Sequence, residues 1–317
     1  MQRISTAPTN AGTRRPRLLV VELWGLGDLA LAIPFLREAS RHADVTLLAK
    51  PQAMELLRRF CPEVEHVAFT APWTAFRGKY RLHEWPWAEL NRVKRELRSR
   101  HFEAAVSVRP DPRDHALLAM VGAKRRTGFP RVGSAILLTD RLPLKANPHR
   151  AAHWSALADS FGWNLPVAQP APRLGRHVVI HTGAGQTVRE WPRARFDEIA
   201  RRLRADDWQV TMLDDSLRSL DELLATLATA DRFIGNDSGP GHLAALLGVP
   251  TFTIFGPQLP EIFSPVHPQA AWIEGRPCPY KPCSDYCRFG SPHCIRELTV
   301  DEVWTRVTAW PESSLVR

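Results

Sequence analysis

Short apolar runs alternate with amphipathic stretches along most of the chain. Apolar runs of strand length occupy residues 17–22, 44–49, 64–69, 104–108, 177–182, 208–213, 231–235 and 250–255. Between them apolar residues recur at helical spacing, as in Leu29, Ala32, Ile33 and Leu36, which predicts helices that each bury one face. This order is typical of parallel sheets covered by helices on both faces.

A proline-rich stretch at residues 164–175 interrupts the alternation, which restarts at residue 177. The sequence therefore predicts an α/β protein with two Rossmann-like domains, at residues 17–170 and 171–317, after a disordered tail at residues 1–16. Two such domains imply a cleft where the strand ends of both sheets meet.

Basic residues outnumber acidic ones by 42 to 33, a formal net charge of +9. This excess reflects either a generally basic proteome or an anionic partner. Because the charge is spread along helices and no nucleic-acid-binding module is recognisable, we expect a phosphorylated substrate or an anionic membrane surface and no nucleic acid. The sequence contains no apolar stretch of about eighteen residues and no secretory signal, so we expect a cytoplasmic protein.

The turn after the first predicted strand carries Gly25, Gly27 and Ala30, the G-x-G-x-x-A spacing of a dinucleotide-binding turn. A nicotinamide site also needs an acidic residue at the end of the second strand, where this chain has Lys50. Asp28 would moreover place a carboxylate where a pyrophosphate binds. Asp28 is thus an N-cap, a general base that accepts a proton from an attacking hydroxyl, or both.

The segment IGNDSGPGHLAALLGVPTFTIFGP, residues 234–257, predicts an anion site. A turn at residues 236–238 leads into a helix that begins near Gly239–Gly241, and the small residues let backbone amides approach a ligand at the positive helix end. Ser238 and His242 add side-chain donors. The alternatives are a buried core histidine at His242 and an N-cap at Asp237.

The loop at residues 182–191 is predicted to lie beside this turn. Pro192 opens the next helix, where its missing N–H costs nothing. Arg189 precedes that helix and is placed to reach an anion in the cleft, unless it is a solvated surface arginine.

Four of the five cysteines gather at residues 278–294: Cys278, Cys283, Cys287 and Cys294. In a reducing cytoplasm they are expected as thiols or metal ligands rather than disulfides. They contain no C-x-x-C pair, which argues against zinc. We expect a compact loop with buried thiols, and a zinc site is the less favoured alternative.

Four stretches resemble glycosyltransferase family 9, the ADP-heptose:lipopolysaccharide heptosyltransferases: LWGLGDLALAIPFLR, REWPRARFDEIARRL, the glycine-rich segment 234–257 and the cysteine segment that runs into CIRELTVDEV. The resemblance implies a GT-B architecture, with acceptor bound by the N-terminal half and sugar nucleotide by the C-terminal half. It implies that Asp28 is the catalytic base and that Arg189, where the family usually has lysine, contacts the diphosphate. The donor site implied is Thr182, Gly183, Arg189, Asp237, Ser238, Gly239, Gly241 and His242.

By this resemblance, the chain is expected to move a heptose from an ADP-sugar to the lipopolysaccharide core or lipid A, with inversion, at the inner face of the inner membrane. No cofactor and no divalent metal are expected, because no Asp-x-Asp pair is present to clamp the diphosphate through a metal. The candidate acceptor contacts are Gly27, Arg77, Lys79, Arg81, Arg109 and Arg113.

The chain departs from the family between the second strand and the leucine-rich helix of the donor half. Family members usually carry roughly twenty further residues there, whereas WQVTMLDDSLRSLDELLATLATA joins the two elements directly. The sequence therefore leaves open a non-catalytic lipopolysaccharide- or nucleotide-binding protein of the same fold. An NAD(P)-dependent oxidoreductase is the less favoured alternative.

Overall fold

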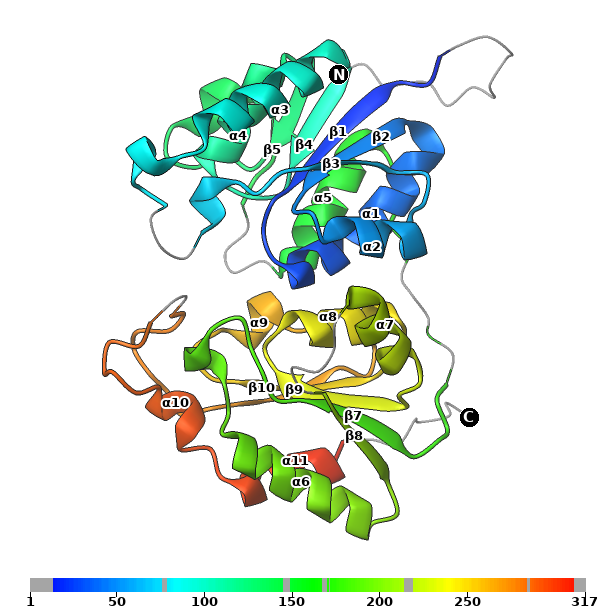
Figure 1. Cartoon of the computed structure of the whole chain (residues 1–317), viewed down its shortest axis with the longest axis vertical. Helices are drawn as coiled ribbons and strands as arrows, with labels where there is room; N and C mark the ends of the chain where they lie inside the picture. The colour runs from blue at the N-terminus through cyan, green and yellow to red at the C-terminus, as the bar shows by residue number, and fades with distance from the viewer. Residues whose placement is uncertain are drawn as a thin grey trace.

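The computed structural model describes residues 14–75, 79–144, 149–166, 170, 172–213, 219–283 and 286–310. It contains two parallel sheets, and the chain completes the first before it enters the second (Figure 1). Residues 1–13 of the expected tail lie outside the described residues. None of the helices that the structure describes is long and apolar enough to cross a membrane.

The first sheet has six parallel strands in the order β3-β2-β1-β4-β5-β6. They are β1 (Arg17–Glu22), β2 (Asp44–Ala49), β3 (Glu65–Ala68), β4 (Ala104–Ser107), β5 (Arg125–Gly128) and β6 (Asp140–Arg141). Its helices are α1 (Leu26–His42), α2 (Ala53–Phe60), α3 (Trp87–Ser99), α4 (Pro112–Val121) and α5 (Arg150–Phe161), with short 3-10 turns η1 (Pro72–Thr74), η2 (Leu82–Glu84) and η3 (Ser134–Leu137). The strand order reverses between β1 and β4, and ligands bind at such a point in open α/β sheets.

The second sheet has five parallel strands in the order β11-β10-β9-β7-β8. They are β7 (His177–His181), β8 (Gln209–Leu213), β9 (Arg232–Asn236), β10 (Thr251–Phe255) and β11 (Ala271–Glu274). Its helices are η4 (Thr187–Arg189), α6 (Arg193–Ala205), α7 (Leu220–Ala228), α8 (Gly239–Leu246), α9 (Pro260–Phe263), α10 (His293–Arg296) and α11 (Val300–Thr308). Here the order reverses between β7 and β9, so the loops after these two strands meet.

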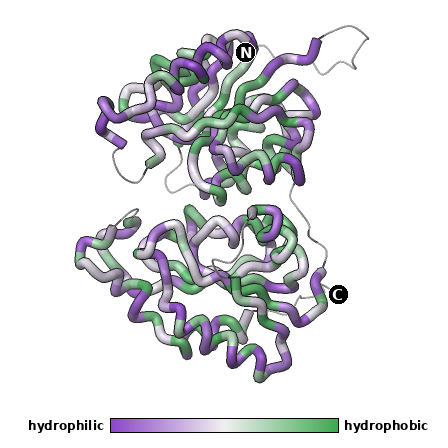
Figure 2. Tube along the Cα trace, in the orientation of Figure 1, coloured by the Kyte–Doolittle hydropathy of each residue, from purple (hydrophilic) through white to green (hydrophobic). Residues whose placement is uncertain are grey.

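Each sheet is buried on both faces because successive strand residues point to opposite sides. In β1, Leu18 and Val20 join the core beneath α1, α2 and α5, whereas Leu19 and Val21 join the core beneath α3 and α4. The coloured tube shows the resulting hydrophobic strands inside each half and polar segments outside (Figure 2).

The two halves are joined by helix packing. Helices α1 and α2 of the first half lie against α8 and α7 of the second, and one buried apolar cluster continues from the first sheet through these helices into the second. A polar contact adds to the junction, since the amide of Asp221 donates to Glu55 Oε2 at 3.2 Å. The position of each half is therefore fixed by buried apolar surface.

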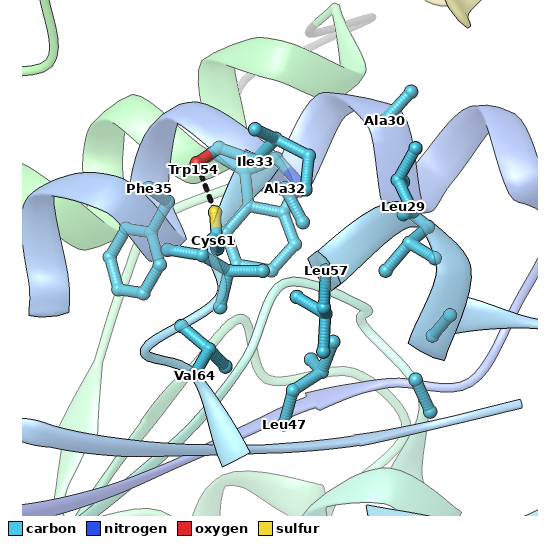
Figure 3. Close-up of a cluster of buried hydrophobic side chains, with 14 of the residues drawn as sticks. Leu29, Ala30, Ala32, Ile33, Phe35, Leu47, Leu57, Cys61, Val64 and Trp154 are labelled. Atoms are coloured by element: carbon cyan, nitrogen blue, oxygen red, sulfur yellow. Dashed lines mark hydrogen bonds between the residues drawn. The ribbon is translucent and has the colours of Figure 1, made fainter. Parts of the chain in front are cut away.

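Cys61, the cysteine outside the clustered segment, belongs to this core. It is fully buried beside Val64 and Leu57, and its Sγ lies 3.9 Å from the Ile33 carbonyl oxygen (Figure 3). Burial raises the pKa of its thiol to about 12, which makes it an inert packing residue.

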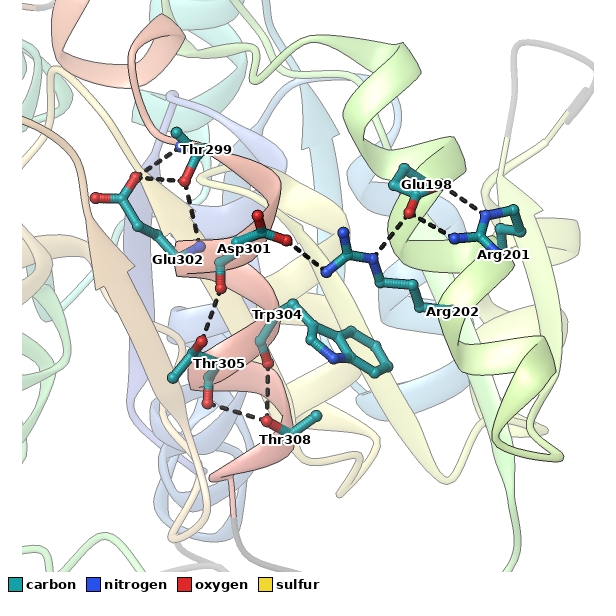
Figure 4. A network of polar contacts seen from close by, with 9 residues as sticks. All are labelled: Glu198, Arg201, Arg202, Thr299, Asp301, Glu302, Trp304, Thr305 and Thr308. Carbon is teal, nitrogen blue, oxygen red and sulfur yellow. Dashed lines mark hydrogen bonds and ion pairs between the residues drawn. The ribbon is translucent and has the colours of Figure 1, made fainter.

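A network of surface ion pairs joins the last described helix, α11, to α6. Arg202 of α6 bonds to Glu198 at 2.8 Å and to Asp301 of α11 at 2.7 Å (Figure 4). A capping box between Thr299 and Glu302 starts α11. Solvent-exposed pairs of this kind contribute little each, and the network lies away from the strand ends where a site is expected.

The prediction of parallel sheets covered on both faces is confirmed, and all eight predicted strands are present within two residues at each end. Three strands, β5, β6 and β11, were not predicted, and neither were the helices α4, α5, α9, α10 and α11. Both β5 and β6 are short and carry polar residues (RRTG and DR), so their sequences lack the apolar run that marks a buried strand.

Candidate active site

The first turn connects β1 to α1. Gly25 is the N-cap residue, and Asp28 is the third residue of the helix. The Asp28 side chain turns back toward the N-cap, and its Oδ2 accepts a hydrogen bond from the Gly25 amide at 3.3 Å. Its negative charge also stabilises the positive end of the helix dipole. The interpretation of Asp28 as the N-cap itself is therefore wrong.

Arg109 holds the other carboxylate oxygen. It follows β4, the neighbour of β1, and its guanidinium forms an ion pair with Asp28 Oδ1 at 2.5 Å. The same group lies over the Trp24 ring, 4.7 Å from its centre. The Asp28 side chain remains 24% exposed, and a carboxylate has about four lone-pair sites. Asp28 is oriented by two contacts and can still accept a proton.

Glu22 lies beneath this pair at the end of β1 and is almost fully buried. Its Oε1 accepts the Trp24 amide at 3.1 Å, and its Oε2 is buried with no partner among the described residues. Burial raises the pKa of Glu22 to about 8, with Arg109 opposing and Asp28 adding to the rise. Glu22 was not among the predicted site residues, although a carboxylate at the end of an apolar strand is visible in the sequence.

The second turn connects β9 to α8, and its aspartate is arranged differently. Asp237 is buried, and its Oδ2 lies 3.4 Å from Arg189 Nη1 of η4. Burial raises the pKa of Asp237 to about 6, and the charge of Arg189 opposes the rise. Ser238 holds the N-cap position, and its Oγ lies 3.3 Å from His181 Nδ1 instead of capping the helix. The alternatives of an N-cap at Asp237 and a solvated Arg189 are wrong.

Asn236 organises the loop opposite this turn. It is the last residue of β9 rather than part of the turn, which corrects the prediction. Its Oδ1 accepts the Trp191 amide at 3.0 Å, and its Nδ2 donates to the Thr182 carbonyl at 2.7 Å and to the Gly183 carbonyl at 3.5 Å. The predicted donor residues Thr182, Gly183, Arg189, Asp237 and Ser238 are thus brought together around one buried amide.

The two turns touch each other. A Cβ added to Gly27 would lie 2.7 Å from His242 Cδ2, and one added to Gly239 would lie 3.1 Å from Leu26 Cβ. Gly241 faces Phe233 of its own half. His242 is buried, its Nδ1 has no partner among the described residues, and burial lowers its pKa to about 4. It is therefore neutral at pH 7. The alternative of a hydrogen-bonded core histidine is right about the burial of His242, but its Nδ1 is unbonded among the described residues and can bond to a ligand.

A second contact between the halves comes from His149, the N-cap residue of the unpredicted helix α5. His149 accepts the Ala151 amide through Nδ1 at 3.2 Å, so its Nε2 carries the proton that it donates to the Ser264 carbonyl at 2.8 Å. Burial lowers the pKa of His149, which keeps this tautomer neutral.

The other predicted acceptor cations do not gather around Asp28 as Arg109 does. Arg113 is bound by Asp111 through two hydrogen bonds of 2.7 and 2.9 Å. Arg81 pairs with Glu84 at 3.1 Å, and Lys79 lies over the Tyr80 ring, in the segment between β3 and α3. Arg77 lies outside the described residues.

The cysteine segment follows β11. Cys294 is buried, but Cys278, Cys283 and Cys287 are only half-buried, so the prediction of buried thiols is wrong for three of the four. The Cys283 and Cys287 thiols donate to the Tyr280 and Ser291 carbonyls. In the described part of the chain no three His, Cys, Asp or Glu side chains are placed to share a metal ion, and the structure thus lends the zinc alternative no support.

Known proteins resemble this chain in sequence and in fold. The model of glycosyltransferase family 9 (heptosyltransferase) matches residues 218–291. Lipopolysaccharide heptosyltransferase 1 of Pseudomonas aeruginosa is 24% identical over 311 residues, which cover 84% of this chain and 86% of that protein.

Two solved structures of the E. coli heptosyltransferase WaaC, one with ADP and one with ADP-2-deoxy-2-fluoro heptose, superpose with TM-scores of 0.69 and 0.71. The first is 16% identical over 93% of this chain and 100% of its own, and the second is 15% identical over 92% and 99%. These likenesses show the two-domain GT-B fold. The segment matched by the family model contains the whole second turn.

Proposed function

We propose that the chain transfers a heptose from ADP-heptose to a hydroxyl of the lipopolysaccharide core, with inversion at the anomeric carbon and without a divalent metal. One observation carries the proposal: a partly exposed carboxylate on the turn of one half stands beside an amide-rich helix terminus on the turn of the other. The solved heptosyltransferase with ADP and the lipopolysaccharide heptosyltransferase of P. aeruginosa supply the donor and acceptor class.

Asp28 takes the proton of the acceptor hydroxyl as that oxygen attacks the anomeric carbon. The bond between this carbon and the diphosphate oxygen breaks on the opposite face, and ADP leaves with the electron pair. Arg189 and the first amides of α8 stabilise the charge that grows on the leaving group, and each such donor commonly contributes about 3 kcal/mol. The proton and the leaving group depart on opposite sides of the sugar, which is the inverting geometry.

Arg109 has two tasks in this proposal. It holds the Asp28 carboxylate toward the junction, and its charge attracts an anionic acceptor. Lys79, Arg81 and Arg113 lie farther along the same half and are proposed to contribute to the acceptor's electrostatic attraction and to binding at the inner face of the inner membrane. The His242 ring lies against the Cα of Gly27. We therefore propose that Gly27 contacts the acceptor only at the edge of this ring.

The test is transfer from ADP-, UDP- and GDP-sugars to a lipopolysaccharide core acceptor by the wild type and by Asp28→Asn. Asn can replace the hydrogen bond to the Gly25 amide through its carbonyl oxygen, so the fold should survive. Loss of the base should reduce kcat by about 10²- to 10⁴-fold. Near-normal transfer by the variant would remove Asp28 from the mechanism.

The short connection between β8 and α7 favours one competing function, a non-catalytic binding protein of the same fold. The sugar-nucleotide panel separates the two. Binding of ADP-heptose without transfer to any core acceptor would favour the binding protein, and transfer from ADP-heptose would exclude it.

A further inference from the structure

Arg150 is the first residue of α5 and lies where the two halves meet. The preceding residue, His149, is hydrogen-bonded to the Ser264 carbonyl of the second half at 2.8 Å. The Arg150 guanidinium lies over the ring of Phe263, also in the second half, 5.3 Å from the ring centre. Arg150 therefore lies in the junction: its backbone belongs to the first half, and its side chain contacts the second.

Arg150 differs from the two other arginines of the site in having no carboxylate. Arg109 is paired with Asp28, and Arg189 is paired with Asp237. Over the described ranges Arg150 forms no ion pair, and its Nε is buried without a hydrogen-bond partner. Arg150 is half-buried, and partial loss of hydration without a counter-ion is costly for a guanidinium.

The charged groups that act on Arg150 are those in and beside the first turn, Arg109, Asp28 and Glu22. Burial lowers its pKa to about 10, the positive charge of Arg109 adds to this, and Asp28 and Glu22 oppose it. The neighbouring His153 is buried and neutral, since burial together with Arg150 and Arg109 lowers its pKa to about 4. Arg109 and Arg150 thus place two positive charges near Asp28. The negative charge of Asp28 compensates them only in part, because Glu22 is largely protonated.

We propose that Arg150 is a phosphate ligand of the reaction site. This rests on the proposed function and names a residue that the donor turn does not supply. A planar guanidinium with several donors suits a phosphate bound through two oxygens. The phosphate is either the diphosphate of the sugar nucleotide, which would then lie between Arg150 of one half and Arg189 of the other, or a phosphate on the acceptor.

The experiment compares the full-length wild type with Arg150→Gln and Arg150→Lys, and Arg125→Gln serves as the matched control. Arg125 also stacks on an aromatic ring, Phe161, but lies at the start of β5 away from the junction. Dissociation constants for ADP, pyrophosphate and adenosine are measured by calorimetry. The KM is measured for a phosphorylated acceptor and for the same acceptor after phosphatase treatment.

If Arg150 binds the donor, Arg150→Gln should weaken ADP and pyrophosphate binding by about 10- to 100-fold. Adenosine affinity should not change, and Arg150→Lys should recover part of the loss. If it binds the acceptor, ADP affinity should be kept, and the KM for the phosphorylated acceptor should rise to that of the dephosphorylated one.

An Arg150→Gln variant with the same ADP affinity and the same acceptor KM as the wild type would overturn the assignment of Arg150 alone. A wild type that binds neither ADP nor pyrophosphate and transfers no sugar would contradict the proposed function and this inference together. Thermal unfolding of both glutamine variants checks that they are folded.

Discussion

The two strand-to-helix turns have the same form, and in each an arginine from another element pairs with the aspartate, but the two aspartates differ in position and exposure. Each lies where the strand order of its sheet reverses, and each begins a helix with glycine in its first turn. In the first, Asp28 lies inside the helix and stays partly exposed. In the second, Asp237 lies before the helix, and its carboxylate is buried against Arg189. The first turn thus offers a base, and the second offers backbone amides and a cation.

The two turns also differ in the residue that ends the preceding strand, β1 or β9. Glu22 ends β1 and keeps one buried oxygen without a partner among the described residues, whereas the Asn236 amide at the end of β9 bonds through both its oxygen and its nitrogen. The Glu22 carboxyl is buried with its pKa raised to about 8, whereas the hydrogen bonds of the Asn236 amide are satisfied. Similar folds therefore acquire different chemistry from the side chains at equivalent places.

Apart from the loss of the base itself, the largest effect is expected at the contact between the turns. In Gly27→Ala the new methyl would lie 2.7 Å from the buried His242 ring, so either this ring or the backbone of the two turns must shift. Displacement by about 1 Å can reduce a rate about 10²-fold, and we expect a loss of that size in kcat/KM. Steady-state kinetics and thermal unfolding measure it.

The same turn supplies the control. A Cβ at Gly25 would meet only Asp28 Oδ2, at an ordinary 3.6 Å, so Gly25→Ala should change kcat/KM by less than about threefold. Gly239→Ala should fall between the two, since its methyl would lie 3.1 Å from Leu26. Equal activity of the Gly25 and Gly27 variants would show that the contact is not needed for catalysis.

The next effect is expected at the scaffold amide. Asn236→Asp replaces the nitrogen that donates to the Thr182 carbonyl with an oxygen and buries a charge beside carbonyl groups. We expect the free energy of unfolding to fall by about 2 kcal/mol, as measured by urea titration. The exposed Asn91 of α3 provides the same chemical change as a control, and Asn91→Asp should stay within about 0.5 kcal/mol.

The smallest effect is expected at Glu22 and depends on pH. Its pKa is about 8 in the folded chain against an ordinary 4.5, so the unfolded chain releases this proton well before the folded chain does. The free energy of unfolding of the wild type should therefore fall as the pH rises through this interval.

Glu22→Gln has no proton to lose and should lack this fall. Relative to the wild type, the variant should gain about 1 kcal/mol or more between about pH 5 and about pH 8. Urea titrations at the two pH values measure the gain. An unchanged difference would mean that Glu22 ionises at its ordinary pKa in the folded chain.

The sequence predicted most of the strands and the residues of both turns, because apolar periodicity and glycine spacing are local signals. It did not predict which carboxylate would be paired with which cation, since Arg109 and Arg189 reach Asp28 and Asp237 from other strands or loops. It also missed β5, β6 and α5, and with α5 the junction residues His149 and Arg150. The contacts of His149 and Arg150 depend on how the two halves pack together, and no local sequence pattern encodes that packing.

The central claim is a division of labour, in which the first turn performs proton transfer and the second holds the donor diphosphate. The dissociation constant for ADP in Asp28→Asn and in Arg189→Gln tests it most directly, by calorimetry on folded full-length protein. We expect Arg189→Gln to bind ADP at least about tenfold more weakly. Asp28→Asn should bind it as tightly as the wild type or more tightly, since a negative charge is removed. If Asp28→Asn lost ADP affinity as Arg189→Gln does, or if Arg189→Gln kept it, the division would be contradicted.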